Sequence, residues 1–283
     1  MRFQNKKCVV TGGLGFIGSH LVDKLINEGA EVIIIDNLSS GYIDNLNPKA
    51  KFLKKDFSKH KLDFRGIDYV FHIGAWGRMP MCLEDPVGAY QNNVMGTIRV
   101  LEAARQAKVK KVVLSSSCIV YCQHTPYWST KIALEDAAKV YREMYGLSTI
   151  CLRYGNVYGT RQKVGMDSAM FAMLKDSFNK EGKVKIFGDG EQTRDWIHVD
   201  DVCEANILAA LSNAEGELDI CTGRSLSLNY IVKEVLKLPY EHTDERKGDE
   251  KHIKLNPEPA LLKIGFKAQK VFEEELPKIW QTL

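Results

Sequence analysis

The chain has 283 residues, of which 45% are hydrophobic and 27% charged, and its formal net charge is +3. A chain of this length buries a core large enough to fold without disulfides or a structural metal. Its nearly balanced charge argues against a dedicated nucleic-acid binder or a protein of the membrane surface.

Cysteine usage and the N-terminal sequence bear on the cellular compartment. The seven cysteines are irregularly spaced, which is not typical of a disulfide framework. No second cysteine pair or histidine cluster accompanies Cys118 and Cys122, so no metal site is predicted. The sequence shows neither a signal-peptide pattern nor an apolar run of the roughly 20 residues that cross a bilayer. We therefore expect a cytoplasmic protein without a metal or a membrane partner.

The first predicted elements are a strand, a glycine-rich turn, a helix and a second strand. Residues 7–11 form a short, mostly apolar run. Ile17, Leu21 and Leu25 then recur at helical spacing, and the next glycine ends the helix. Residues 32–35 are all β-branched, as expected for a strand that is buried on both faces.

This alternation continues through the first half of the chain. We predict further strands over 69–73 and 111–114, and long helices over 86–107 and 126–144, each opened by a proline. Strands that alternate with helices indicate an α/β fold, a Rossmann-type doubly wound parallel sheet with helices on both faces.

The sequence changes character after residue 158, where turn-rich stretches interrupt the alternation. We predict a Rossmann domain over residues 1–158, with residues 194–220 returning to it. Residues 159–193 and 221–283 then form a smaller mixed α/β region toward the C-terminus.

The turn after the first strand indicates a dinucleotide site. Gly12, Gly15 and Gly18 follow a Gly-x-x-Gly-x-x-Gly spacing, which permits a tight turn and lets backbone N–H groups at a helix N-terminus bind a pyrophosphate. Asp36 ends the second strand, and its carboxylate would accept hydrogen bonds from a ribose 2′-OH and repel a 2′-phosphate. No arginine follows it closely. The sequence therefore predicts NAD, rather than NADP, as the cofactor.

Tyr127 and Lys131 lie one helical turn apart and so share a face of their helix. The preceding strand ends in Ser115, Ser116 and Ser117, and ligands of such sheets bind at the carboxyl ends of the strands. A tyrosine with its usual pKa near 10 needs about 4 kcal/mol of phenolate stabilisation to act as a base at neutral pH. A neighbouring ammonium and a cationic nicotinamide can supply it.

At these residues the sequence resembles the extended short-chain dehydrogenase/reductases, and within them the UDP-glucose 4-epimerase group of sugar-nucleotide enzymes. The resemblance covers nearly the whole chain. It includes an Asn-Val-x-Gly-Thr motif at 93–97, Ser-Ser-Ser-x-x-Val-Tyr at 115–121 and Arg-Tyr-x-Asn-Val-Tyr-Gly at 153–159. It implies that Ser117, Tyr127 and Lys131 are the catalytic residues.

The resemblance also implies that the Rossmann domain over residues 1–158 binds NAD and that the smaller region over 159–193 and 221–283 binds the substrate. The residues expected to bind the substrate are Ser117, Asn156, Arg194 and Arg246. For Arg246 a role as a solvated surface residue stays open. The residues expected to bind NAD are Gly12, Gly15, Phe16, Ile17, Asp36, Asn37, Ser39, Asp56, Phe57, Gly74, Ala75, Asn93, Ser115, Tyr127, Lys131 and Tyr154.

Two departures from the family pattern concern the sugar pocket. Only residues 122–126 separate Tyr121 from Tyr127, where relatives carry a considerably longer segment. The pocket is therefore more open, or is closed by something else, such as a partner subunit. Trp128 stands where relatives have a smaller residue, and it either stacks on a sugar or base or packs between subunits. Functional and structural roles both stay open for Arg78, Cys118 and His124.

The resemblance implies NAD-dependent epimerisation of a nucleotide-diphosphate sugar, with a UDP-hexose 4-epimerase as the leading reading. Such an enzyme works through transient hydride transfer and a 4-keto intermediate. A 4,6-dehydratase would need acidic residues directly after Ser117, where Cys118 and Ile119 stand. An NAD(P)-dependent sugar-nucleotide reductase uses the same catalytic residues and stays open. A non-catalytic NAD-binding sensor or scaffold is a further alternative, although such proteins often lose the tyrosine or the lysine.

Family members dimerise through two long helices, which correspond here to residues 86–107 and 127–144. Ala133, Ala137 and Ala138 are small enough to let helices approach closely. The expected partners are therefore a second copy of the chain and a nucleotide-sugar substrate, with a UDP sugar favoured, and no nucleic acid.

Overall fold

The structure, a computed structural model, describes residues 1–122, 124–164, 170–244 and 251–283. Its largest element is a seven-stranded, fully parallel sheet in the order β10-β6-β5-β4-β1-β2-β3. This arrangement confirms the predicted doubly wound fold. The strands are β1 (Lys7–Thr11), β2 (Glu31–Asp36), β3 (Lys51–Lys54), β4 (Tyr69–His72), β5 (Lys111–Ser117), β6 (Thr149–Tyr154) and β10 (Gly216–Ile220).

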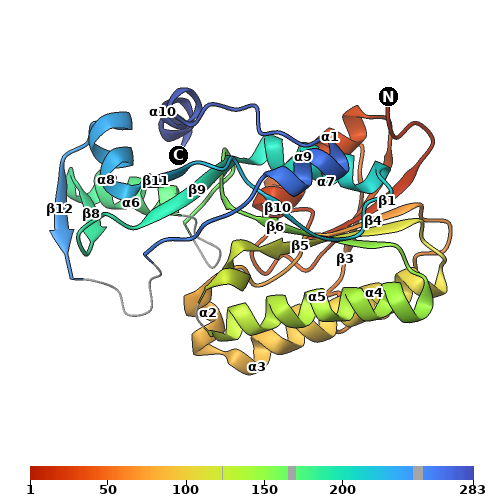
Figure 1. Cartoon of the computed structure of the whole chain (residues 1–283). Coiled ribbons are helices and arrows are strands. Elements are labelled where there is room, and N and C mark those ends of the chain that lie inside the picture. Colours follow the sequence, from red (N-terminus) through yellow and green to blue (C-terminus); the bar gives the residue numbers. More distant parts are fainter. Residues whose placement is uncertain (123, 165–169, 245–250) are drawn as a thin grey trace.

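Helices cover both faces of this sheet. The helices α4 (Gly96–Gln106) and α5 (Pro126–Tyr145) lie side by side on one face, while α1 (Phe16–Asn27), α7 (Val199–Leu211) and α9 (Glu258–Ile264) lie on the other (Figure 1). The middle residues of β1, β2, β5 and β6 are apolar, as expected for strands whose two faces are both buried.

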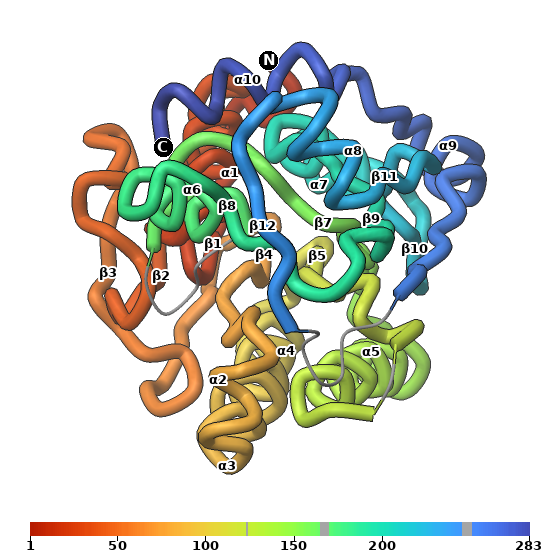
Figure 2. Tube along the Cα trace, turned by 90° about the vertical axis from the view of Figure 1, so that its left-hand side faces the viewer, coloured from red at the N-terminus to blue at the C-terminus, as the bar shows by residue number. Residues whose placement is uncertain are grey.

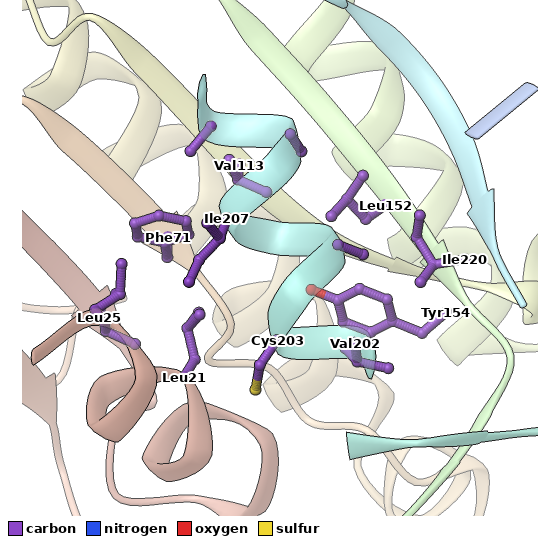
Figure 3. Close-up of a cluster of buried hydrophobic side chains, with 14 of the residues drawn as sticks. Leu21, Leu25, Phe71, Val113, Leu152, Tyr154, Val202, Cys203, Ile207 and Ile220 are labelled. Carbon is purple, nitrogen blue, oxygen red and sulfur yellow. The ribbon is translucent and has the colours of Figure 1, made fainter. Parts of the chain in front are cut away.

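The core beneath α1 and α7 holds the sheet and helices together. Leu21 and Leu25 of α1 face Ile207 of α7 (Figure 3), and all three side chains are fully buried. Each such side chain contributes roughly 1.5–3 kcal/mol of burial free energy. This packing fixes the N-terminal turn of α1 against the carboxyl edge of the sheet.

A smaller region lies at one end of the molecule and faces the viewer in Figure 2. One of its sheets has the order β11-β9-β7, and the other pairs β12 with β8. An aromatic cluster of Tyr158, Phe171, Trp196 and Phe272 fills its interior. Its elements are β7 (Asn156–Tyr158), α6 (Met170–Glu181), β8 (Val184–Phe187), β9 (Thr193–His198), β11 (Ser225–Ser227), α8 (Leu228–Tyr230), η4 (Ile231–Val235), β12 (Tyr240–Thr243) and α10 (Phe272–Thr282).

The chain crosses between the two regions several times. The strand β10 pairs with β6 in the large sheet, and α7 packs into the core beside that sheet. The strands β7 and β9 pair with each other in the small three-stranded sheet. Near the C-terminus, Ala260, Ile264 and Phe266 pack into the large core rather than the small one, because α9 lies against β10 and α7.

The helix predicted over 86–107 is not a single regular helix. It consists of α3 (Pro86–Ala89), a π-helical turn η2 (Tyr90–Met95) and α4. None of the helices in the described ranges is long and apolar enough to cross a membrane. The other short elements are η1 (Ile43–Asn45), α2 (Met79–Glu84) and η3 (Cys118–Tyr121).

Candidate active site

A cavity of about 480 Å³ lies at the carboxyl ends of the parallel strands. Its walls come from the turn after β1, from the ends of β2, β4, β5 and β6, and from β7 and β9 of the small region. Doubly wound sheets bind their ligands at this edge. One continuous cavity therefore joins the predicted cofactor and substrate sites.

The turn between β1 and α1 has no room for a side chain at its glycines Gly12 and Gly18. Gly12 has a φ of +66°, and a Cβ there would lie 2.6 Å from the Cα of Gly74 at the end of β4. A Cβ on Gly18 would overlap the carbonyl of Gly12. The backbone of this turn and the first turn of α1 thus line the cavity directly. The N-terminus of a helix lies at the positive end of its dipole and fits a diphosphate.

The carboxylate of Asp36 is fixed by the backbone around it. Its two oxygens accept hydrogen bonds from the N–H groups of Leu14 (3.0 Å) and Leu38 (2.8 Å). A Cβ on Gly41 would lie 3.0 Å from both oxygens, so this glycine lets the loop pass close over the carboxylate. Asp36 lines the cavity, where an ionised carboxylate accepts hydrogen bonds but donates none. It therefore fits ribose hydroxyls and disfavours a phosphate.

A buried hydrogen-bond chain supports the glycine turn from behind. Thr97 donates its hydroxyl to the carbonyl of Asn93 (2.5 Å), so its oxygen accepts from Nε2 of His72 (3.0 Å). Nδ1 of His72 then accepts from the hydroxyl of Thr11 (2.7 Å). Burial lowers the pKa of His72 to about 3, and the charge of Lys131 acts in the same direction. This histidine is a neutral structural group that ties β1 and β4 to α4.

Lys131 contacts the end of β5, and Tyr127 lies beside Lys131, as the position of their helix after the serine-ended strand predicts. The Nζ of Lys131 donates to the backbone oxygen of Ser115 (2.7 Å) and lies 5.8 Å from the centre of the Tyr127 ring. Burial lowers the pKa of Lys131 to about 8. The Oγ of Ser117 accepts from the N–H of Ile119 (3.2 Å) and caps η3. Ser117, Tyr127 and Lys131 all line the cavity.

An ion pair braces the far side of this group. Arg153 on β6 donates two hydrogen bonds to the carboxylate of Glu135 on α5, at 2.8 and 2.7 Å. Ser116 donates to the same carboxylate (2.6 Å). Arg153 also donates to the hydroxyl of Tyr121 (2.7 Å), which in turn donates to Asp219 (2.8 Å). The network links β5, β6, β10, α5 and η3 directly behind the reactive side chains.

The opposite end of the cavity belongs to the small region. Asn156 on β7 and Arg194 on β9 both line it. The guanidinium of Arg194 donates to the carbonyls of Thr193 (2.9 Å) and Lys251 (3.4 Å), which fix its direction. With five N–H donors in all, an arginine fixed in this way has the geometry to bind an anionic diphosphate.

The structure brings most of the predicted site residues together, and it places two of them, Asp56 and Asn93, away from the cavity wall. Asp56 accepts hydrogen bonds from Ser58, and Asn93 holds the backbone of Trp76 at 2.8 and 3.1 Å; neither side chain lines the cavity. Arg246 lies outside the described residues. The predicted residues that do line the cavity are Gly12, Gly15, Phe16, Ile17, Asp36, Asn37, Ser39, Phe57, Gly74, Ala75, Ser115, Ser117, Tyr127, Lys131, Tyr154, Asn156 and Arg194.

Several lining residues were not predicted as members of the site. Trp196 had a usable signal, because it stands two residues after Arg194 on a strand and so shares its face. Asn92 also had a usable signal, because it precedes Asn93, the first residue of the Asn-Val-x-Gly-Thr motif. Nothing local marked the others, which tertiary folding brings to the cavity. The lining residues that were not predicted include Trp76, Asn92, Gln162, Met170, Trp196 and Ile253.

The structure places the residues whose roles the sequence left open. Arg78 lines the cavity and is half-buried. Cys118 is buried, and burial raises the pKa of its thiol to about 12, so it is inert. The indole Nε1 of Trp128 donates to the carbonyl of Val120 (3.1 Å), and the ring of His124 lies 4.3 Å from that of Trp128.

Comparison with known proteins bears on the same arrangement. The model of the NAD dependent epimerase/dehydratase family matches residues 8–221. A UDP-glucose 4-epimerase from Mycolicibacterium smegmatis is 32% identical over 96% of both chains. The UDP-N-acetylglucosamine 4-epimerase from Methanobrevibacter ruminantium, solved in complex with UDP-N-acetylmuramic acid, superposes with a TM-score of 0.92 at 36% identity, covering 99% of this chain and 98% of that one. The Thermus thermophilus UDP-glucose 4-epimerase in complex with NAD gives a TM-score of 0.87 at 30% identity over 98% of both chains.

The family match and the cavity agree on the cofactor. The matched residues include the glycine turn, Asp36 and the Ser117, Tyr127 and Lys131 group. The glycine turn between β1 and α1 and the fixed carboxylate of Asp36 fit a dinucleotide with a free ribose diol. NAD is the cofactor. The chain belongs to the NAD-dependent epimerase/dehydratase family, as an extended short-chain dehydrogenase/reductase of the sugar-nucleotide epimerase group.

Proposed function

We propose that this protein interconverts UDP-hexoses that differ in configuration at carbon 4. The observation that carries the proposal is the placement of Ser117, Tyr127 and Lys131 in one cavity with the glycine turn and Arg194. A sugar joined to a diphosphate can then reach the tyrosine while its phosphates meet the arginine.

In this proposal Tyr127 is the acid–base group. It takes the proton of the 4-hydroxyl as carbon 4 becomes a ketone, and it returns the proton when the ketone is reduced from the other face. Lys131, held by the backbone oxygen of Ser115, stabilises the phenolate. Ser117 donates a hydrogen bond to the same substrate oxygen. NAD, when bound, supplies a reversible acceptor for the hydrogen of carbon 4.

The binding roles follow from the ends of the cavity. Asp36 holds the adenosine ribose of the cofactor, and the turn at Gly12 holds its diphosphate. At the other end Arg194 binds the substrate diphosphate, with Asn156 beside it. Uridine is the favoured base because the relatives named above carry UDP sugars in their names.

The residues after Ser117 disfavour the dehydratase alternative. Elimination of water needs a proton donor and a base next to the reacting carbons. Cys118 and Ile119 both line the cavity at this place. Isoleucine cannot transfer protons, and the raised pKa of the Cys118 thiol keeps it protonated. The geometry therefore supports epimerisation, which needs only the tyrosine, lysine and serine.

We further propose that the enzyme is a homodimer joined through the outer faces of α3, η2, α4 and α5. Several apolar side chains are exposed there, and Val87 is 79% exposed and Met144 73%. A cytoplasmic location stays a prediction of the sequence. The exposed apolar residues on these helices are Val87, Tyr90, Met95, Val140, Met144 and Tyr145.

The proposal is tested with purified protein, UDP-glucose, UDP-galactose and their N-acetylated forms, followed by proton NMR. Conversion without added NAD is expected, and the preferred pair identifies the sugar. The variant Tyr127→Phe should still bind NAD and should convert the sugars far more slowly than the wild type does. If the wild type converts none of them even with NAD supplied, the UDP-hexose 4-epimerase proposal is wrong.

A further inference from the structure

The two catalytic hydroxyl groups stand on either side of a very short loop. Ser117 caps the N-terminus of η3, and Tyr127 lies in the first turn of α5. Only residues 122–125 connect the two elements. The distance between the serine and tyrosine hydroxyls is therefore set by how η3 and the first turn of α5 are held against each other.

Trp128 joins these two elements directly. Its indole Nε1–H donates to the carbonyl of Val120 within η3 (3.1 Å). Its backbone N–H donates to the hydroxyl of Thr125, which caps α5 (3.1 Å). One residue therefore bonds to η3 through its side chain and to the helix cap through its backbone, and it closes the loop at its base.

Neighbouring contacts make the indole bond a rigid link. The end of η3 is fixed because Tyr121 lies between Arg153 and Asp219 in the ion-pair network. On the other side the ring of His124 packs edge-on against Trp128 at 4.3 Å. Trp128 is half-buried, and it is not among the described residues that line the cavity. It therefore acts on the site through Val120 and Thr125.

We propose that Trp128 is a positioning residue, whose indole N–H clamps η3 to α5 and so holds Ser117 and Tyr127 in register on the substrate oxygen. The clamp does the work of a longer loop, since it fixes the junction without additional chain. The catalytic part of this proposal rests on the proposed epimerase activity.

The test is the variant Trp128→Phe, which keeps an aromatic ring beside His124 and removes the N–H donor. We expect kcat to fall about tenfold and KM to change by less than about twofold, because the lost interaction orients reacting groups rather than binding the substrate. The acid limb of the pH profile of kcat should move to higher pH, because Tyr127 is no longer held as closely to Lys131. Trp280→Phe, on α10, is the control for an indole replacement away from the cavity: it removes packing from the core of the small region and should leave kcat, KM and the pH profile unchanged.

Amide hydrogen exchange gives a readout that does not depend on the substrate. In the NAD-bound protein, residues 118–128 should exchange faster in Trp128→Phe than in the wild type or the control. If the wild type converts no UDP sugar, the proposed function fails, and this exchange experiment still decides whether the clamp exists. Unchanged exchange would overturn the clamp.

Two kinetic results would also overturn the proposal. Unchanged kcat with the wild-type pH profile would show that the indole bond does not position the site. A raised KM with unchanged kcat would show that Trp128 contacts the substrate itself. If Trp128→Phe does not fold, β-(3-benzothienyl)alanine at the same position keeps the shape of indole and removes only the N–H. The same losses in kcat and exchange protection are then expected.

Discussion

The Nζ of Lys131 donates a 2.7 Å hydrogen bond to the backbone oxygen of Ser115 and lies 5.8 Å from the centre of the Tyr127 ring. The ammonium of Lys131 is thus hydrogen-bonded to a main-chain carbonyl. The nearby carboxylate of Glu135 accepts hydrogen bonds from Arg153 and Ser116 instead. Burial consequently lowers the pKa of Lys131 to about 8. The lysine is kept available for the tyrosine at a cost to the stability of the NAD-free protein.

Lys131→Met should raise the melting temperature of the NAD-free protein at pH 7 and abolish turnover. The pKa of Lys131 falls from the usual 10.5 to about 8, so the folded state holds this proton less tightly than the unfolded state. The charge therefore destabilises the fold fully below pH 8, and the effect fades as pH rises to 10.5. Thermal scans across this range should show the gain shrinking. Lys139→Met, exposed on the same helix, is the control, and a gain that does not change with pH would contradict the explanation.

Tyr127→Phe should reduce kcat by roughly 10²–10⁴-fold, the usual contribution of a general acid–base group. KM should change little, because the ring and its contacts remain. Steady-state kinetics with the preferred UDP sugar measures both constants. Tyr145→Phe alters an exposed tyrosine at the end of the same helix and should leave both unchanged. Retained activity in Tyr127→Phe would assign the proton transfer to another group.

Asp36→Asn should weaken NAD binding and reduce the preference for NAD over NADP. The amide of asparagine replaces one acceptor oxygen by an NH₂ donor. The variant therefore loses a hydrogen bond, either from the backbone N–H of Leu14 or Leu38 or from the ribose. We expect NAD to bind about tenfold more weakly, because this is the effect of losing one hydrogen bond to a charged group. Calorimetric titration of NAD-stripped protein with each dinucleotide measures this. Asp44→Asn, exposed in η1, should bind as the wild type does.

His72→Gln should lower the stability at neutral pH and flatten its decline in acid. The pKa of His72 is about 3 instead of 6.5. Between these pH values the histidine is protonated in the unfolded state and neutral in the folded state. His72 therefore makes stability fall as pH drops from 6.5 toward 3. At pH 7 the broken chain through Thr11 and Thr97 should cost about 1–3 kcal/mol. Urea unfolding at several pH values separates the two effects. The control is His242→Gln, which replaces an exposed histidine and should show neither effect.

The parts of the fold that were predicted are those in which local pattern and tertiary environment agree. The strand that ends in Asp36 is β-branched because both of its faces are buried, so its pattern alone identified it. Tyr127 and Lys131 were found because helix periodicity and the end of β5 point to the same place. The fold, the family and NAD as the cofactor are confirmed in this way.

The remainder depends on contacts between distant segments. Trp196 and Ile253 reach the cavity because β9 and the segment after residue 250 fold over the sheet edge. The partner of the Trp128 indole is a carbonyl on another element, and no residue pattern marks a carbonyl as an acceptor. For the same reason the sequence placed Asn93 in the cofactor site, whereas its amide holds the backbone of Trp76 one layer behind it.

The π-helical turn η2 makes the site sensitive to chain length as well as to residue identity. Asn92 and Asn93 are adjacent yet both buried, one lining the cavity and the other bonded to Trp76 and Thr130. Successive residues of a regular α-helix point about 100° apart, and a π-helical turn changes which side chains face the sheet. We expect a deletion of one residue here to convert η2 to an ordinary helical turn and to shift α2 and α3, with Arg78 at the start of α2, relative to the sheet. Helix content should change little, while the cavity wall near Arg78 should be displaced.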